Sequence, residues 1–438
     1  MIIRDAGTGE GRYGDLNELP NGRTAEPSNA FSGDADRPIY RTICSRKVTP
    51  CVLVFTMDFP PEVGGIQTVA HRLCQSFRRV RPTVIAPCAD GDRDFDRRQG
   101  FPMVRVGTRP PRTRADRSLT LARMLITAFP LVRKDKPAAV LCMQPLTAPL
   151  ALVYRRVMGL PYVVYAHGME LLGGRGIGAL RRAGRVIAVS RYTRGLLLAR
   201  NISEDRIVVI GHGVNGLGGS ESLPDPFVRY PSLRGKRLLL TVSRLSELYK
   251  GHDVVLRSLP LVAARVPDVA YVVVGDGVLR PYYENLAASL GQTHRVVFIG
   301  QADQQTVEAW YRACDLLVMV SRDRAVDGGA EGFGLVYLEA NRFGKPVVVG
   351  NAGGAPDAVL DGETGILVDP ESEMAVSRVI IELLSDPALC ARLGRQGQQR
   401  ALKERGWLRV AEQVEDVILD MVNGPAGVVS TAGSSSAG

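Results

Sequence analysis

The sequence contains no long apolar run. It nowhere has about 18 consecutive apolar residues, the length that a membrane-spanning helix needs. The N-terminus also lacks the apolar core of a secretory signal peptide. We therefore expect a protein that neither spans a membrane nor is exported by the usual signal, and a cytoplasmic location is the default expectation.

Cysteine is scarce and scattered. The chain has 7 cysteines, which form no C-x-x-C pair and mostly lie in apolar runs, a pattern typical of buried thiols in a reducing compartment. No group of cysteines and histidines has the spacing of a zinc site. Residues 90–96 space their aspartates like a cation-binding loop, but the closing glutamate of an EF-hand is missing. We interpret that segment as a solvated turn and expect no bound metal.

Nucleic-acid-binding motifs are absent as well. The sequence shows no helix-turn-helix, ribonucleoprotein or zinc-finger pattern, so we expect no nucleic-acid partner. Lys and Arg number 55 against 45 Asp and Glu, which gives a net charge of +10. Such an excess suits anionic partners such as nucleotide diphosphates or anionic lipid head groups, and charge alone does not choose among them.

What the chain does contain is a regular alternation of apolar strand-like runs with segments long enough for helices. This alternation is typical of a parallel, doubly wound α/β sheet. Its 438 residues are too many for one ordinary core, so we expect two α/β domains of similar size with one site between them. The predicted strands are residues 51–56, 83–86, 103–106, 138–142, 162–165, 186–189, 207–210, 238–242, 270–274, 296–299, 316–320 and 346–349.

Changes of composition predict the domain boundaries. Gly, Asp and Pro without periodicity indicate a disordered leader, and Gly, Pro and Ser after the seventh strand indicate a linker. The last helix has an apolar stripe that must dock on other parts of the chain. The predicted parts are a leader (1–47), an N-terminal Rossmann-like domain (48–213), a linker (214–236), a C-terminal Rossmann-like domain (237–405), a helix docking on the N-terminal domain (406–423) and a flexible tail (424–438).

The most informative segment, residues 331–339, lies at a predicted loop-to-helix junction. It begins and ends with glutamate, and Gly332 and Gly334 let a ligand approach the backbone closely. The free N–H groups of the helix's first turn suit a diphosphate. We expect Glu339 to bind a ribose diol and Glu331 a sugar hydroxyl. Taken alone, the segment fits a capped surface helix with ordinary acidic residues equally well.

Two cations, Arg244 and Lys250, follow the first predicted strand of the second domain. Rossmann-type sheets bind ligands at the carboxyl ends of their strands, so both cations can neutralise a leaving diphosphate. The alternative is that they decorate a loop in an arginine-rich protein. In the first domain, Gly64 and Gly65 let a loop bend close to phosphates and acceptor, and Asp58 beside them suits an acceptor-side contact.

Four motifs of the second half follow one another along the chain, at residues 242–244 with 250–253, 274–277, 331–339 and 350–356. Their types and order strongly resemble glycosyltransferase family 4, which has the GT-B fold of two Rossmann-like domains facing an interdomain cleft. The resemblance covers about residues 48–422 and is most specific in the second half. Within the family, the chain looks most like the bacterial phosphatidylinositol mannosyltransferase type. The motifs are residues 58–61 with 64–67, 242–244 with 250–253, 274–277, 331–339 and 350–356, and a lead-in at 322–330 echoes the same subgroup.

The resemblance implies a metal-independent, retaining hexosyltransferase that needs no cofactor beyond its nucleotide-sugar co-substrate. It implies a front-face mechanism with His167, Arg244, Lys250 and Glu331 as catalytic residues, and His167 as a hydrogen-bond partner of the transferring sugar. GDP-mannose is the first choice of donor, and a lipid-linked or glycan acceptor of cell-envelope or polysaccharide synthesis is expected. The implied donor-binding residues are Gly65, Arg244, Lys250, Gly277, Glu331, Gly332, Phe333, Gly334, Leu335, Val336 and Glu339, and the acceptor-side residues are Asp58, Gly64, Gly65, Gln67 and His167.

Several alternatives remain open. One is a transferase that uses a UDP-hexose and a soluble small-molecule acceptor, and another is a non-catalytic basic nucleotide-binding protein. A third is another GT-B enzyme, such as an epimerase or a phosphorylase, although no segment suggests the pyridoxal lysine of a phosphorylase.

Residues 118–134 raise the question of membrane contact at the inner face. Their apolar residues and nearby arginines fit a peripheral amphipathic helix facing anionic lipid. They fit a crossover helix with a solvated basic flank equally well. The residues concerned are Leu119, Leu121, Met124, Leu125, Ile126 and Phe129 with Arg109, Arg112, Arg114, Arg117, Arg123 and Arg133.

Overall fold

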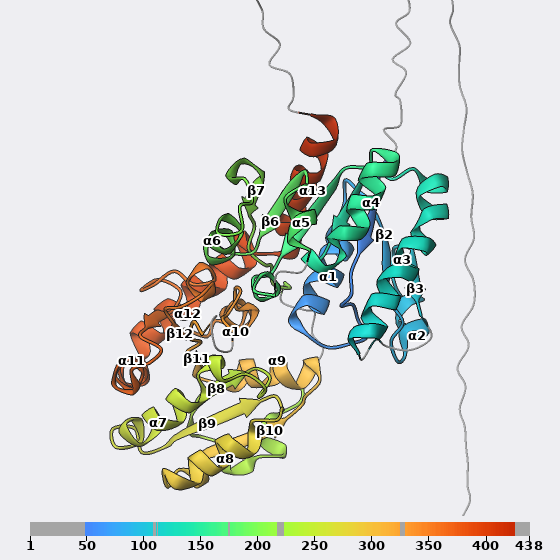
Figure 1. Ribbon diagram of the computed structural model, residues 1–438. Helices are drawn as coiled ribbons and strands as arrows, with labels where there is room; N and C mark the ends of the chain where they lie inside the picture. Colours follow the sequence, from blue (N-terminus) through green and yellow to red (C-terminus); the bar gives the residue numbers. More distant parts are fainter. Residues whose placement is uncertain are drawn as a thin grey trace, which may run out of the picture. The chain divides into compact units, whose positions relative to one another are not determined.

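Two all-parallel sheets organise the protein. The computed structural model describes residues 49–107, 111, 113–173, 176–216, 223–324 and 329–424, and both sheets lie in one compact unit that starts at Thr49. In Figure 1 the first sheet runs from blue to green and the second from yellow-green to orange. The predicted leader, most of the tail, and parts of the linker and of the 322–330 lead-in fall outside the described residues.

Within the described residues the first sheet has seven strands in the order β3-β2-β1-β4-β5-β6-β7. Val52 and Val54 of β1 belong to one hydrophobic cluster and Leu53 and Phe55 to another, so both faces of the sheet are covered. Strands covered on both faces are continuous apolar runs, as predicted. The elements are β1 (Cys51–Phe55), α1 (Gly65–Ser76), β2 (Arg81–Pro87), α2 (Asp92–Asp96), β3 (Met103–Val106), α3 (Arg114–Asp135), β4 (Ala139–Cys142), α4 (Ala148–Met158), β5 (Tyr162–Ala166), α5 (Ile177–Leu180), β6 (Arg185–Ala188), α6 (Arg191–Leu198) and β7 (Ile207–Val209).

The second sheet has the order β10-β9-β8-β11-β12-β13 in the described part of the chain. Helices α7, α8 and α11 cover one face of this sheet. The hydrophobic cluster between them and the sheet includes Leu239, Tyr271 and Leu316. The elements are β8 (Arg237–Val242), α7 (His252–Ala263), β9 (Val269–Val274), α8 (Arg280–Ser289), β10 (Val296–Gly300), α9 (Gln304–Ala313), β11 (Leu316–Met319), α10 (Leu335–Arg342), β12 (Val347–Gly350), β13 (Ile366–Val368), α11 (Glu373–Ser385), α12 (Pro387–Glu404) and α13 (Trp407–Asn423).

The predicted α/β class with two doubly wound sheets is confirmed, and each predicted strand is present with its ends shifted by at most a few residues. The prediction missed β13, which has 3 residues and pairs only with β12 in the described sheet. The segment predicted as a solvated turn contains the short helix α2, whose Asp96 pairs with Arg105 at 2.8 Å. No helix of the described residues is both long and apolar enough to cross a membrane.

The last helix, α13, packs against α1 of the first sheet's layer. Its fully buried Glu415 accepts hydrogen bonds from the backbone N–H groups of Arg78, Arg79 and Val80 at 2.8, 2.6 and 3.0 Å. All three bonds go to Oε1, while Oε2 has only the Arg79 guanidinium at 3.5 Å and no hydrogen bond within the described residues. These contacts attach α13 to the turn between α1 and β2.

Candidate functional site

Both sheets place their candidate residues at topological switch points. The strand order reverses at β1 and β4 in the first sheet and at β8 and β11 in the second. In open parallel sheets, ligands bind beyond the carboxyl ends of the strands at such points. Asp58 follows β1, Arg244 and Lys250 follow β8, and Glu331 follows β11.

A buried ion pair joins the two loops of the second sheet. The Nζ atom of Lys250 lies 2.5 Å from Oε2 of Glu331, and the two side chains are 14% and 13% exposed. Burial opposes the charge on the ammonium, but the Glu331 carboxylate and Tyr249 outweigh it and raise the pKa of Lys250 above its ordinary value. Lys250 therefore carries its charge throughout the neutral pH range, next to a carboxylate.

Arg244 behaves differently from Lys250. Its side chain is 73% exposed and pairs with Oε1 of Glu247 at 3.0 Å. The other oxygen of Glu247 is buried and has no hydrogen-bond partner among the described residues. An exposed arginine of this kind can turn toward a phosphate at little cost, because an exposed ion pair contributes only about 0–1 kcal/mol.

Glu339 lies in α10 and is held by a tyrosine. The fully buried Tyr311 donates a hydrogen bond from its hydroxyl to Oε2 of Glu339 at 2.8 Å. Burial raises the pKa of Glu339, although the Tyr311 hydrogen bond and the nearby Arg342 oppose the rise. The Tyr311 hydroxyl thus fixes the orientation of this buried carboxylate.

Glycines bring the loop ahead of α10 close to the first sheet. A side chain at Gly332 would lie too close to the carbonyl oxygen of His167, and Gly354 packs in the same way against the Gly332 carbonyl. Gly334 has a φ of 91°, the left-handed region that favours glycine, and α10 starts directly after it without a side-chain cap. Leu335, the first residue of α10, faces Gly65 at the start of α1.

His167 is anchored on both its backbone and its side chain. Its backbone N–H donates to Glu170 at 2.5 Å, and its Nε2 lies 2.9 Å from the carbonyl oxygen of Met143, which can only accept. The ring packs against Tyr165 and His212 with centroids 5.2 and 5.5 Å away. Nε2 is thus occupied, and Nδ1 is the ring nitrogen left for a ligand.

The Asp58 carboxylate sits between two glutamine amides. Gln67 donates to Oδ1 at 3.3 Å, Gln144 donates to Oδ2, and Oε1 of Gln144 accepts from the backbone N–H of Met57 at 2.8 Å. Burial raises the pKa of Asp58, while the nearby His167 lowers it. The two amides thus hold the carboxylate in place just beyond the carboxyl end of β1.

Some of the predicted ligand residues also have packing contacts within the protein. Phe333 is 2% exposed and packs edge-on against His212 at 5.2 Å, so its side chain lies in the core. Gly277 packs against the backbone of Leu245, so it supports the loop of Arg244. Val336 is partly buried against the same core as Phe333. The Gln67 amide packs so closely against Gly64 that a side chain at Gly64 would clash with it.

Sequence reasoning missed several site residues, namely Gln144, Glu247 and Tyr311. Gln144 directly precedes the short turn Pro145–Thr147 after β4, and its position at a strand end beside the switch point is a usable signal. Tyr311 lies inside an amphipathic helix and carries no such signal, because a tyrosine on the apolar face of a helix is expected to be an ordinary core residue. Among the described residues, no group of three or more His, Cys, Asp or Glu side chains could hold a metal ion.

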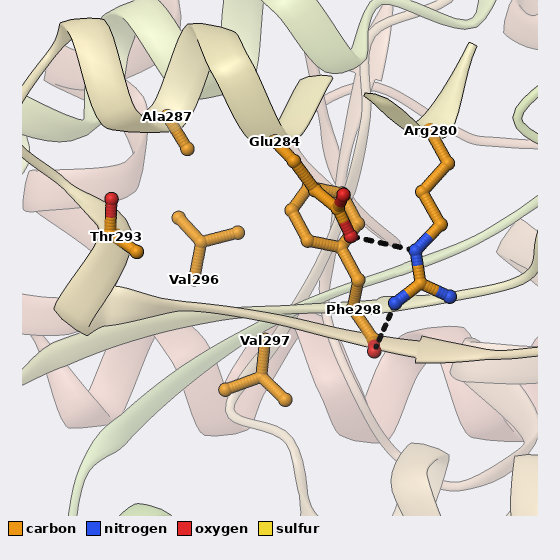
Figure 2. A pocket seen from close by; sticks show the side chains of 7 residues that line it. All are labelled: Arg280, Glu284, Ala287, Thr293, Val296, Val297 and Phe298. Atoms are coloured by element: carbon orange, nitrogen blue, oxygen red, sulfur yellow. Dashed lines mark hydrogen bonds and ion pairs between the residues drawn. The ribbon is translucent and has the colours of Figure 1, made fainter. Parts of the chain in front are cut away.

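A separate hollow lies between α8 and β10, away from the switch points (Figure 2). Its volume is about 360 Å³, and it is lined by Arg280, Glu284, Ala287, Thr293, Val296, Val297 and Phe298. Arg280 lies at one side of it, bonded to Glu284 at 2.7 Å and to the Phe298 carbonyl at 3.4 Å. Its charged groups are already paired with each other, so we assign it no ligand.

Comparison with known proteins agrees with this arrangement. Residues 63–215 match the family model Glycosyltransferase Family 4, and residues 227–400 match the model Glycosyl transferases group 1. Sucrose-phosphate synthase from Thermosynechococcus elongatus has a similar fold, with a TM-score of 0.69 and 19% identity over 85% of this chain and 99% of that chain. The complex of Anabaena Alr3699/HepE with UDP and glucose also has a TM-score of 0.69, at 19% identity over 85% of this chain and 100% of that chain.

The chain belongs to the GT-B glycosyltransferases of family 4. Its similarity extends over most of its length to enzymes that act on phosphatidylinositol mannosides. The GDP-mannose-dependent alpha-(1-6)-phosphatidylinositol monomannoside mannosyltransferase of Mycolicibacterium smegmatis is 32% identical over 374 residues, 81% of this chain and 95% of that protein. The corresponding enzyme of Corynebacterium glutamicum, which acts on the monoacylated acceptor, is 27% identical over 387 residues, 84% of this chain and 97% of that protein.

Proposed function

We propose that this glycosyltransferase moves a mannosyl group from GDP-mannose to a phosphatidylinositol mannoside or a related glycolipid, with retention of anomeric configuration and without a metal. The names of the relatives that are 32% identical over most of the chain support this donor and acceptor. The observation that carries the proposal is the buried Lys250–Glu331 pair at the switch point, next to the loop that meets the His167 carbonyl.

Each charge of the pair has a distinct task. Lys250 and Arg244 bind the diphosphate, where two fixed cations offset the charge that builds as it leaves. Glu331 accepts from a hydroxyl of the sugar. Glu339, oriented by Tyr311, accepts from the ribose. The protein thus acts through positioning and electrostatics rather than through a covalent intermediate.

The transfer follows a front-face path. The bond from the sugar's anomeric carbon to the diphosphate oxygen breaks, and the acceptor hydroxyl forms its bond on the same face. The hydroxyl proton passes to an oxygen of the departing diphosphate, so the products are the α-mannoside and GDP. Asp58 and Nδ1 of His167, on the first sheet, orient the acceptor and the sugar during this step.

Helix α3 provides contact with the membrane that holds the acceptor. Its buried face consists of Thr120, Met124, Ala128 and Val132, so Met124 belongs to the core rather than to a lipid-facing stripe. Leu119, Ile126 and Phe129 are 51%, 72% and 41% exposed on the remaining surface. Apolar side chains among arginines suit an anionic lipid interface.

Liposome flotation tests the membrane contact. We expect wild-type protein to float with anionic but not with neutral vesicles at low salt, and Ile126→Glu to weaken flotation. Met374→Glu is the matched control, because Met374 is 75% exposed on α11. Equal flotation of both variants, or no lipid-dependent shift of the wild type, would remove α3 as the contact.

The donor and acceptor are tested by incubating purified protein with GDP-mannose and phosphatidylinositol monomannoside in EDTA. We expect a mannosylated lipid and GDP to form together. UDP-glucose serves as the alternative donor and inositol 3-phosphate as a soluble acceptor. Turnover only with UDP-glucose, or only on addition of a divalent metal, would contradict the proposal.

A further inference from the structure

A chain of buried polar side chains lies directly behind the two cations. Thr241 at the end of β8 is within 2.8 Å of the Tyr271 hydroxyl on β9, and that hydroxyl is 3.2 Å from Nδ1 of His252. Nε2 of His252 is 2.8 Å from the hydroxyl of Ser243, which precedes Arg244. His252 is 1% exposed and begins α7, two residues after Lys250.

The donors and acceptors along this chain can be assigned. The Thr241 hydroxyl donates to the carbonyl oxygen of Val318, so the Tyr271 hydroxyl must donate to Thr241. The Tyr271 oxygen then accepts from Nδ1–H of His252. In a neutral imidazole Nε2 then carries a lone pair, and the Ser243 hydroxyl, which also lies 3.3 Å from the Arg244 carbonyl oxygen, donates to Nε2 at the shorter distance of 2.8 Å.

The surroundings favour an uncharged imidazole. Burial, together with the smaller effect of the nearby Lys250 charge, lowers the pKa of His252 to about 3. The other ring against His252 is that of Tyr283, with centroids 5.0 Å apart. A protonated ring would have two N–H groups and could not accept from Ser243.

Backbone contacts hold each cationic segment in place, and the His252 side chain joins the two by its hydrogen bond with Ser243. The N–H of Ser243 donates to the Val274 carbonyl at 3.0 Å, which holds the loop of Arg244 against β9. Gly251, at φ 78°, packs against the Val320 carbonyl and holds the turn of Lys250 against the end of β11. The imidazole spans from one segment to the other.

We propose that His252 is a positioning residue for the donor diphosphate: as a neutral ring protonated on Nδ1, it fixes the Arg244 loop relative to the Lys250 turn. The inference rests on the proposed function, which assigns both cations to the diphosphate. Displacement of a binding group by about 1 Å can reduce turnover by about two orders of magnitude, so a lost link has a measurable effect.

The test uses three variants: Ser243→Ala, His252→Leu and the double variant that carries both changes. Ser258→Ala is the matched control. Ser258 is a fully buried serine of the same helix that bonds only to the Val255 carbonyl within the described residues. We expect Ser243→Ala to weaken GDP binding and mannosyl transfer about tenfold, and the double variant to be no worse than His252→Leu, because both changes break one link. His252→Gln should recover part of the loss, since its amide oxygen can accept from Ser243.

A ¹⁵N NMR spectrum of histidine-labelled protein gives a readout that a merely structural role would not move. We expect His252 to be protonated on Nδ1 alone from pH 8 to pH 5, and its Nε2 resonance to shift in Ser243→Ala. A proton on Nε2, additive effects of the two changes, or equal GDP affinity in Ser243→Ala and Ser258→Ala would overturn the proposal.

Failure of the proposed function is separable from failure of this inference. Binding is therefore measured for GDP, UDP and ADP. A wild-type protein that binds one of them without transferring mannose would contradict the donor assignment, while the affinities of the His252 and Ser243 variants for that nucleotide would still support or overturn the positioning role.

Discussion

Replacement of Glu331 by glutamine removes one charge of the buried pair and changes little else. At 2.5 Å the attraction between the two charges amounts to about 7 kcal/mol at an effective dielectric constant of about 20, before desolvation is subtracted. Loss of one partner of a buried pair costs about 3–5 kcal/mol, because the other charge stays buried without compensation. We expect the melting temperature of Glu331→Gln to fall by on the order of 10 °C.

The same substitution, although it lowers the stability of the protein, should strengthen the binding of the nucleotide. Without Glu331, Lys250 has no carboxylate to leave when a diphosphate binds, so we expect GDP to bind about tenfold more tightly, a gain of about 1.4 kcal/mol. Mannosyl transfer should nevertheless fall by roughly 10²-fold, since the sugar hydroxyl loses its charge-assisted hydrogen bond to the carboxylate. GDP should therefore restore part of the lost melting temperature.

Calorimetric titration with GDP, thermal unfolding and a transfer assay measure these three effects. The control is Glu204→Gln, because Glu204 forms an exposed pair with Arg194, and such pairs contribute about 0–1 kcal/mol. If Glu331→Gln melted like the control and bound GDP more weakly than wild type, the reasoning about the pair would be refuted.

Further predictions follow from the same site. His167→Ala should lower transfer strongly and change GDP affinity little, and calorimetry beside a transfer assay would show an equal loss of both if the residue were structural. Tyr311→Phe should weaken GDP binding by about 1 kcal/mol, because Glu339 loses the donor that orients it; unchanged affinity would contradict this role. Arg244→Ala should reduce the rate in EDTA by roughly 10²-fold, with partial recovery in Arg244→Lys, since a point charge lacks the planar fork of arginine; near-normal turnover of the alanine variant would contradict its place on the diphosphate. Burial lowers the pKa of both His212 and His252, so below about pH 6.5 their imidazoles take up protons in the unfolded state but not in the folded state. Each histidine should therefore lower the free energy of unfolding by about 1.4 kcal/mol for each pH unit below that value. Urea unfolding between pH 7.5 and 5.5 measures the slope, and flat stability over that range would contradict two buried neutral histidines.

The fold could be predicted because its strands are covered on both faces. Continuous apolar runs such as Val269–Val274 stand out from the helices between them. The strand Ile366–Val368 could not be recognised, because three residues after a turn carry no periodicity. Register and sheet order depend on long-range packing and came from the structure alone.

The candidate site was predictable in its parts but not in its pairings. Glycines and charges at strand ends indicated where Lys250 and Glu331 lie, since ligands bind there in Rossmann-type sheets. That they bind each other across 81 positions of sequence, at 2.5 Å, depends on how two loops meet. The direction of the Phe333 side chain likewise followed from packing against His212 rather than from its motif.

The anomeric configuration of the product shows whether the transfer retains the configuration of the donor. Wild-type protein is incubated with GDP-α-mannose, phosphatidylinositol monomannoside and EDTA, and the anomeric configuration of the product is read by NMR from the one-bond carbon–proton coupling of its new mannose. We expect an α-mannoside formed in step with GDP in the absence of any divalent metal. A β-mannoside, or a product that appears only when a divalent metal is supplied, would contradict it.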